Sequence, residues 1–168
     1  MNRIVLFEPE KPANTGNIIR TCMAFDAKLT IIGPLSFSLD DKAFMRAKMD
    51  YALNFEIERM DTIDEFLERY KKWEGYFVTR YSKHVYSTND YSDDTKDYFF
   101  MFGRESTGIP YDVLRKHLDR TIRIPMAINA RSLNLSDSVS IIISEVKRQQ
   151  KFSSLAVSET IKGKDFLG

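Results

Sequence analysis

Tyr98-Phe99-Phe100-Met101-Phe102 sets the expected architecture of this chain of 168 residues. The run is apolar or aromatic at every position, whereas a strand with one face in water would alternate apolar and polar residues. Continuous runs of this kind are typical of strands covered on both faces, as in the parallel sheets of α/β proteins. Similar short runs that we also interpret as strands lie at residues 4–7, 29–32, 55–57, 76–79 and 121–124. The sequence therefore predicts an α/β fold with a mostly parallel central sheet flanked by helices.

Helical patterns separate several of these runs. Between residues 61 and 70, apolar side chains recur at the spacing of one helix face, and Thr62 and Glu65 have the spacing of a capping box. A second pattern begins at Leu135, where an apolar stripe runs beside a stripe of small residues: Ser136, Ser140 and Ser144. Small residues suit either close packing at a subunit interface or a solvated face, and periodicity does not choose between them.

Composition limits the classes of protein to which this chain can belong. Hydrophobic residues make up 43% of it, and its 25 basic and 24 acidic residues leave a net charge of +1. The chain can therefore bury a core, and its charge does not indicate a nucleic-acid partner, although a local basic patch stays compatible with one. Cys22 is the only cysteine, and His84 and His117 lack metal-ligand spacing, so we expect no disulfide and no metal.

The chain shows no internal repeat and no linker that would divide it. We expect one domain over residues 1–152, a C-terminal tail over 153–168, and a long polar surface loop over 82–96. The first residues have too short an apolar run for a signal peptide, and no segment has the length of a membrane span. We therefore expect a cytoplasmic protein without a membrane partner.

The segment Pro12-Ala13-Asn14-Thr15-Gly16-Asn17 begins a predicted helix. At 3.6 residues per turn, Asn17, Arg20 and Thr21 share its polar side, opposite an apolar side that includes Cys22. Arg20 thus points away from the core, either near the sheet edge where ligands bind or as a surface arginine without a role. We interpret Cys22 as a core residue rather than as a nucleophile.

A second segment, Gly103-Arg104-Glu105-Ser106-Thr107-Gly108-Ile109-Pro110, directly follows the strand of the opening run. Gly103 allows backbone amides to approach a ligand, and Glu105 is able to accept hydrogen bonds from a ligand or from an arginine. Pro110 suits the first position of a helix. The segment is neither a Walker loop nor a Gly-x-Gly-x-x-Gly fingerprint, and a plain turn is the alternative.

A third segment, Ile124-Pro125-Met126-Ala127-Ile128-Asn129-Ala130-Arg131-Ser132-Leu133-Asn134-Leu135-Ser136, is a polar loop between an apolar strand and an apolar helix. Its Arg131, Ser132 and Asn134 lie where binding and catalytic groups are common, on a loop held between rigid elements. The alternative is that Asn134 or Ser136 only caps the helix that follows.

Together, these segments resemble the SPOUT superfamily of RNA methyltransferases, in particular the small tRNA ribose 2′-O-methyltransferases that act on the wobble nucleotide. The matching motifs are Pro12-x-Asn14-Thr15-Gly16-Asn17-Ile18-Ile19-Arg20, Met101-Phe102-Gly103-x-Glu105-x-x-Gly108-Ile109-Pro110, and Ile124-Pro125-Met126 followed by Arg131-Ser132-Leu133-Asn134-Leu135-Ser136. The resemblance extends from Ile4 to about Gln150. It implies a SPOUT fold, a parallel α/β sheet with a C-terminal trefoil knot, which is rare among proteins.

The resemblance also implies S-adenosylmethionine as cofactor, the anticodon stem-loop of tRNA as substrate, and an active site formed across a homodimer. The implied reaction is methyl transfer to the ribose 2′-oxygen of the wobble cytidine or uridine. The implied cofactor-binding residues are Val78, Thr79, Gly103, Ile124, Met126, Ser132 and Leu133. The implied catalytic residues are Arg20, Glu105, Ser132 and Asn134. Arginine is effectively always protonated, so stabilisation of a developing alkoxide is an alternative to general-base action by Arg20.

Two positions depart from the family pattern. Ser144 precedes Glu145 where the family often has a tyrosine, and Asp137 stands where an asparagine is common. Both departures bear on the substrate more than on the type of reaction. The cations that we consider for RNA contact are Arg3, Arg46, Lys48, Arg131, Lys147 and Arg148.

Three other functions stay compatible with the sequence. They are 2′-O-methylation of another RNA, RNA binding without catalysis in the same fold, and a flavodoxin-like signalling domain. The last is disfavoured because Glu8-Pro9-Glu10-Lys11-Pro12 replaces the acidic cluster that such a domain has after its first strand.

Overall fold

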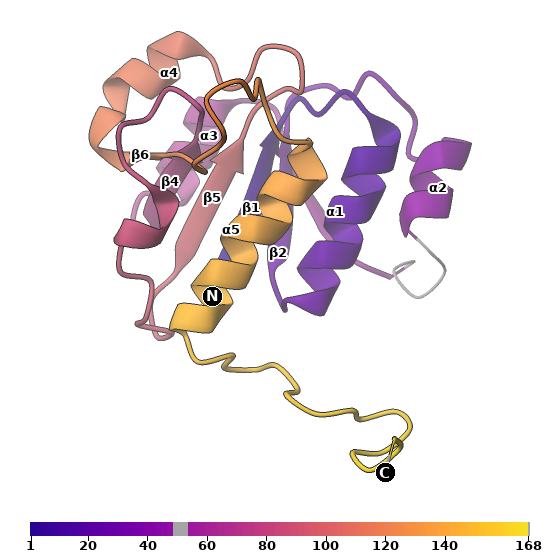
Figure 1. The fold of residues 1–168 in the computed structure, drawn as a ribbon. Coiled ribbons are helices and arrows are strands. Elements are labelled where there is room, and N and C mark those ends of the chain that lie inside the picture. Colours follow the sequence, from indigo (N-terminus) through magenta and orange to yellow (C-terminus); the bar gives the residue numbers. More distant parts are fainter. Residues whose placement is uncertain (49–53, 168) are drawn as a thin grey trace.

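Figure 1 shows the computed structural model, which describes residues 1–48 and 54–167. In this part of the chain, six parallel strands form one sheet in the order β3-β2-β1-β5-β4-β6. The strands are β1 (Asn2–Phe7), β2 (Lys28–Ile32), β3 (Ile57–Met60), β4 (Glu74–Val78), β5 (Tyr98–Phe102) and β6 (Thr121–Ile122). The helices are α1 (Pro12–Ala24), α2 (Lys42–Lys48), α3 (Ile63–Arg69), α4 (Tyr111–Lys116) and α5 (Leu135–Gln149), with 3₁₀ turns η2 (Tyr86–Thr88) and η3 (Leu118–Arg120). The parallel sheet between helices confirms the predicted α/β fold.

The central strands are buried on both faces, as the continuous apolar run of β5 predicts. Tyr98, Phe100 and Phe102 pack with α1 and α5 on one face, whereas Phe99 and Met101 pack with α3 and α4 on the other. Each of these five side chains is at most 2% exposed. Figure 1 shows α1 and α5 side by side over one face of the sheet, with α3 behind it. The core therefore consists of two apolar layers separated by the sheet.

Some strand ends differ from the sequence-based prediction. β5 has the predicted bounds, but β3 starts and ends later than the predicted 55–57. Glu58 and Arg59 belong to β3, which lies at the edge of the sheet, where charged side chains are tolerated and hydropathy is a poor guide. β6 is shorter than predicted, since Arg123 pairs with Val85 in the loop after β4 instead of continuing the strand.

Local capping signals set the starts of two helices. Thr62 Oγ1 accepts a hydrogen bond from the backbone N–H of Glu65 at 3.1 Å, and the Glu65 carboxylate accepts one from the backbone N–H of Asp61 at 3.1 Å. The Thr62 bond satisfies a donor that the first turn of α3 leaves open, so Thr62 is confirmed as the cap. The Glu65 carboxylate instead bonds Asp61, the residue before the N-cap, whereas a capping box would use the N–H of Thr62. Pro110 stands at the N-cap of α4, one position before the predicted one, because its ψ of 136° is extended.

The predicted surface loop over 82–96 is not wholly exposed, because Tyr91 is fully buried. Its ring meets that of Tyr98 edge-on, and its hydroxyl donates to the Tyr86 carbonyl at 2.7 Å. Its backbone N–H donates to the side chain of Gln149 at 2.7 Å. With both polar groups satisfied, the aromatic ring can enter the core and anchor the loop to α5. The prediction of a surface loop is therefore wrong at this residue.

The strand order creates a switch point between β1 and β5. After β1 the chain proceeds to β2 and β3 on one side, whereas β5, β4 and β6 lie on the other. The connections after β1 and β5 therefore diverge, and open α/β sheets bind ligands in the crevice at the carboxyl ends of such strands. This topology determines where the site lies.

The segment after α5, residues 150–167, extends away from the rest of the chain at the end of the sheet opposite the carboxyl ends of the strands (Figure 1). Most of its side chains are exposed. Over the described residues, no helix is both long enough and apolar enough to cross a membrane.

Candidate active site

A cavity of about 410 Å³ lies beside the switch point, at the carboxyl ends of β4, β5 and β6. Its lining comes from the segments that follow these strands and from the start of α1. All residues predicted to bind the cofactor line it, namely Val78, Thr79, Gly103, Ile124, Met126, Ser132 and Leu133. Of the predicted catalytic residues, Glu105, Ser132 and Asn134 line it, whereas Arg20 is not among the described residues that do.

The turn after β5 requires glycine at Gly103. A Cβ atom there would lie 1.9 Å from the carbonyl carbon of Gly108 and 2.1 Å from the nitrogen of Ile109. Two backbone hydrogen bonds of 3.2 and 2.9 Å between Arg104 and Gly108 close the turn. Gly108 has a φ of +75°, which favours glycine. The two glycines therefore set the path of the backbone along one side of the cavity.

One chain of hydrogen bonds connects all three sequence motifs. Asn14, at the start of α1 and only 6% exposed, donates from Nδ2 to Glu105 Oε1 at 3.1 Å. Its Oδ1 accepts a hydrogen bond from Asn134 Nδ2 at 3.0 Å. The Glu105 carboxylate also accepts from the backbone N–H groups of Glu10 at 2.8 Å and Lys11 at 3.2 Å. These contacts hold the connection after β1, the turn after β5 and the segment before α5 together.

Glu105 therefore does not use an arginine as its partner, one of the two roles that the sequence suggested. Its two oxygens meet donors from the connection after β1, and a carboxylate with several such donors is a strong anchor. The arginine of the same turn, Arg104, pairs instead with Glu8, with Nε 2.7 Å from Oε2. The geometry of Glu105 is that of a residue that positions a loop.

Asn134 caps α5, one of the two roles that the sequence left open, and it also lines the cavity. Its Oδ1 accepts hydrogen bonds from the backbone N–H and from the hydroxyl of Ser136, each at 2.8 Å, and so caps α5. Its Nδ2 donates to Asn14 at the edge of the cavity. Because the two ends of the amide serve different partners, the cap and the site use the same side chain.

Arg20 lies on the polar side of α1, as predicted, and is half-buried. Asn14 in the first turn lines the cavity, but Arg20 is six residues further, about 9 Å along the helix axis. Close to it, Thr21 Oγ1 and Ser140 Oγ lie 3.2 Å apart. At Ser140, the serine stripe of α5 therefore faces α1 of the same chain.

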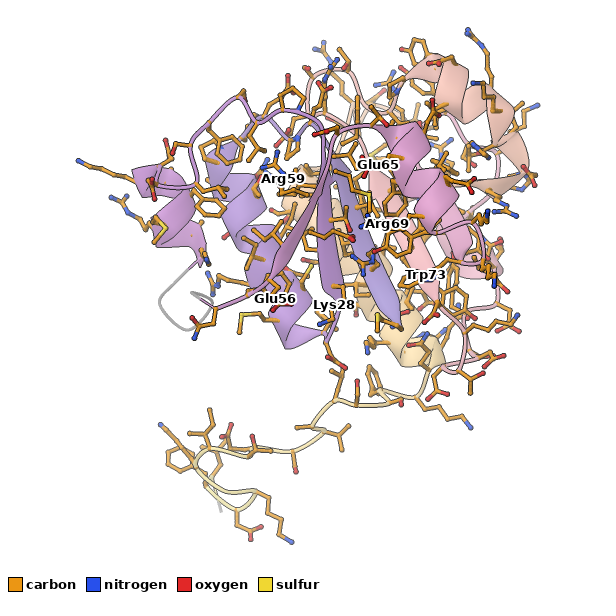
Figure 2. All side chains as sticks on the ribbon, turned by 180° about the vertical axis from the view of Figure 1, so that it is seen from behind. Lys28, Glu56, Arg59, Glu65, Arg69 and Trp73 are labelled. Carbon is orange, nitrogen blue, oxygen red and sulfur yellow. The ribbon has the colours of Figure 1, made fainter. Side chains whose placement is uncertain are left out.

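Of the cations considered for RNA contact, Lys147 is buried and Arg3 is largely covered by other side chains. The side chain of Arg3 is 12% exposed, lies 2.7 Å from Glu58 and is covered by the rings of Tyr70 and Trp73. Figure 2 shows Trp73 on the side of the sheet away from α1 and α5. Lys147 is 4% exposed, and burial lowers the pKa of its ammonium group. Both predictions are wrong, since residue type does not reveal burial. The prediction stays untested for Arg46, Lys48, Arg131 and Arg148.

The sequence reasoning assigned no role to several residues that line the cavity. Asn14 lies inside the first motif, but no local pattern indicates that its amide joins the other two motifs. Arg80 and Tyr81 also line the cavity, just after β4. Their position at the carboxyl end of a predicted parallel strand was the available signal. Arg80 Nη1 donates to the carbonyl of Arg131 at 3.0 Å and so joins two walls of the cavity.

Cys22 and His117 have packing roles in the structure. Cys22 is fully buried, and burial raises the pKa of its thiol, which confirms its interpretation as a core residue. The ring of His117 stacks on Phe77 at 4.7 Å, and burial lowers its pKa. In residues 1–48 and 54–167, no three His, Cys, Asp or Glu side chains are grouped so that they could hold a metal ion.

Curated relatives match this chain over most of its length. A protein of Listeria monocytogenes is 50% identical over 154 residues, which cover 92% of this chain and 91% of the relative. The Escherichia coli K12 protein named tRNA (cytidine(34)-2'-O)-methyltransferase is 40% identical over 150 residues, which cover 89% of this chain and 94% of the relative.

Solved structures share the fold. One, described as giving structural insight into the 2-OH methylation of C/U34 on tRNA, has a TM-score of 0.82 and 31% identity over 90% of this chain and 97% of its own. An AdoMet-bound rRNA methyltransferase from Sinorhizobium meliloti has a TM-score of 0.76 and 27% identity over 88% of this chain and 56% of its own. The SpoU rRNA Methylase family matches residues 1–144. With the three motifs gathered around one cavity, this chain therefore belongs to the SpoU rRNA Methylase family of methyltransferases.

Proposed function

We propose that this chain transfers a methyl group from S-adenosylmethionine to the ribose 2′-oxygen of cytidine or uridine 34 in the anticodon stem-loop of tRNA. The observation that carries the proposal is the cavity around which Asn14, Glu105 and Asn134 join the three motifs. The name of the Escherichia coli relative and the work on C/U34 methylation support the choice of substrate. A tRNA substrate fits a cytoplasmic enzyme.

The cavity fits the proposed cofactor in size and chemistry. Its volume of about 410 Å³ lies within the range of small-molecule sites. Val78, Ile124 and Leu133 offer apolar surface for an adenine ring, and the tight turn at Gly103 brings backbone amides to the wall. Bound there, S-adenosylmethionine would supply an electrophilic methyl group on a sulfonium. Met126, Ser132 and Thr79 complete the proposed cofactor site.

The protein's own groups act by positioning and charge. Ser132 and Asn134 orient the nucleotide and the cofactor, and Glu105 holds the walls of the site through its bonds to the connection after β1. Arg20, as a permanent cation, orients the ribose hydroxyl and stabilises negative charge on its oxygen as the proton passes to solvent water. Placement of the ribose oxygen in line with the methyl group to be transferred also accelerates the reaction.

We propose further that two chains form the active site together. Arg20 lies outside the cavity lining of its own chain, about 9 Å along α1 from Asn14, which supports its action in the cavity of a partner subunit. We also propose that the chain is knotted as in the SPOUT fold. In support, the chain passes from β6 at the sheet edge back to α5, which packs beside α1.

The reaction is tested with purified protein, S-adenosylmethionine labelled in its methyl group, and tRNA from cells that lack this modification. We expect label in the 2′-O-methyl nucleotide at position 34, located by nuclease digestion and mass spectrometry. Methylation of a base, or no transfer to any tRNA, would contradict the proposal.

A matched substrate provides the control. An anticodon stem-loop with 2′-deoxyribose at position 34 has the same sequence but lacks the accepting oxygen. We expect this RNA to bind without accepting a methyl group. Label in the deoxy substrate would show that another atom is methylated.

A further inference from the structure

Two tyrosines beside the cavity are exposed, whereas most aromatic side chains of the described residues are buried or half-buried. Tyr81 is 58% exposed and Tyr111 is 53% exposed. Tyr81 follows β4, and Tyr111 is the first residue of α4, directly after the second motif. Neither ring belongs to the core, so core packing does not account for their placement.

The two rings form a pair. Their centroids lie 5.7 Å apart in an edge-to-face arrangement, and their hydroxyl oxygens are 3.3 Å apart. Contact between α4 and the loop after β4 therefore holds both rings in place before any ligand arrives. A preformed aromatic surface loses little conformational entropy on binding.

An arginine guanidinium lies over each of the two rings. The guanidinium carbon of Arg80 lies 5.2 Å from the Tyr81 centroid, and that of Arg115 lies 6.0 Å from the Tyr111 centroid. Both arginines are exposed. Proteins that bind single-stranded nucleic acid combine aromatic rings, on which the bases stack, with cationic side chains that contact the phosphates.

The pair adjoins the proposed reaction site. Tyr81 and Arg80 line the cavity, and Arg80 donates to the carbonyl of Arg131 in the segment that forms its opposite wall. An RNA loop whose ribose enters the cavity must therefore place a neighbouring nucleotide close to the two rings.

We propose that Tyr81 and Tyr111 are a stacking platform for an unpaired base next to the nucleotide that is methylated, and that Arg80 and Arg115 contact the flanking phosphates. The choice of RNA rests on the proposed function. The platform explains how a chain with a net charge of +1 holds a loop of RNA: affinity comes from base stacking and local cations rather than from overall charge.

The test measures binding of an anticodon stem-loop that carries a fluorescent purine next to position 34. Tyr111 is the residue to change, because it is outside the cavity lining among the described residues. We expect Tyr111→Leu to weaken RNA binding about tenfold and to abolish the quenching of the purine by stacking. We expect Tyr111→Phe, which keeps the ring, to bind RNA within about twofold of the parent.

A matched control is Phe152→Leu, which removes another exposed ring (42%) that follows α5. It should leave RNA binding unchanged, and all variants should keep the parent's melting temperature and its affinity for S-adenosylmethionine in calorimetry. RNA affinity unchanged in Tyr111→Leu, equal losses in Tyr111→Leu and Tyr111→Phe, or a parent that does not bind the RNA would each overturn the platform. A parent that binds and stacks the RNA but does not methylate it overturns the proposed function and leaves the platform supported.

Discussion

Asn14 holds together a site whose parts lie far apart in the sequence. Its amide bonds with Glu105, 91 residues away, and with Asn134, 120 residues away. A buried amide that both donates and accepts fixes the relative position of two walls. The same side chain in an isolated helix would be an ordinary polar residue near the N-terminus.

We therefore expect Asn14→Ala to weaken both stability and cofactor binding. The change removes the acceptor of Asn134 Nδ2 and one of the three donors to the Glu105 carboxylate in a partly buried site, which costs about 1–3 kcal/mol of unfolding free energy. Chemical denaturation checks the first effect, and calorimetry with S-adenosylmethionine checks the second.

Asn17→Ala, one turn along the same helix and outside the cavity lining described above, is the control. It should bind S-adenosylmethionine like the parent. An Asn14→Ala protein with the parent's affinity would show that the hydrogen-bond chain does not shape the cavity.

At the scale of secondary-structure elements, one carboxylate joins β3 to β1, β2 and α3. Glu58 accepts hydrogen bonds from Arg3 and Tyr70 at 2.7 Å, from Thr30 at 2.6 Å and from Arg69 at 3.0 Å. Burial raises the pKa of Glu58, but the hydrogen bonds from Thr30 and Tyr70 and the charge of Arg3 outweigh it, so the pKa lies below 4.5. The edge strand thus depends on an ionised side chain.

This arrangement predicts a stability that is sensitive to acid. Because folding lowers the pKa of Glu58, its contribution is fully present above the unfolded value near 4.5 and is lost as the pH falls through the folded value. We expect Glu58→Gln to melt at a lower temperature than the parent at neutral pH, and the gap to shrink below pH 4.5. Thermal unfolding followed by circular dichroism over a pH series measures both.

Glu68→Gln is the matched control, since Glu68 is 74% exposed and forms a surface ion pair with Lys71, three residues further along the chain. Surface pairs of this kind contribute little to stability. A gap between parent and Glu58→Gln that stays constant from neutral to acid pH would exclude the ionised carboxylate as its cause.

At the scale of the whole molecule, the position of Arg20 links the proposed reaction to assembly. The cavity of one chain collects every other predicted site residue, whereas Arg20 lies further along α1. If two chains share the site, Arg20 of each chain acts in the cavity of its partner. Neither Arg20→Ala nor a variant with a filled cavity would then be active alone.

We expect these two inactive variants to restore activity when they are expressed together. Arg20→Ala keeps the cavity, and Ser132→Trp fills it from an exposed position without changing the core. Half of the dimers would then be mixed, each with one complete site, which gives about a quarter of the parental methyl transfer.

Arg20→Ala alone should still bind S-adenosylmethionine, and calorimetry on this variant is the control for folding. Recovery of activity in the mixture requires an arginine that acts across the dimer. An inactive mixture that contains mixed dimers would place Arg20 in the cavity of its own chain instead.

Local patterns predicted those features that depend on neighbours in the sequence. The apolar run of β5, the helical face before Tyr70 and the Thr62 cap follow from side-chain period and turn chemistry, and the structure confirms them. The edge strand β3 and the burial of Tyr91 were predicted poorly, because charged edges and anchored loops carry no hydropathy signal.

The sequence by itself determined the α/β class, because side-chain period is a local property. Its resemblance to a known family supplied the family and every predicted site residue that lines the cavity. Only the tertiary structure decided that Glu105 accepts hydrogen bonds from backbone amides, that Arg3 is largely covered, and that Arg20 is not among the residues that line the cavity of its own chain. The physical reason is that burial and hydrogen-bond partners arise from contacts between distant segments, which neither periodicity nor spacing encodes.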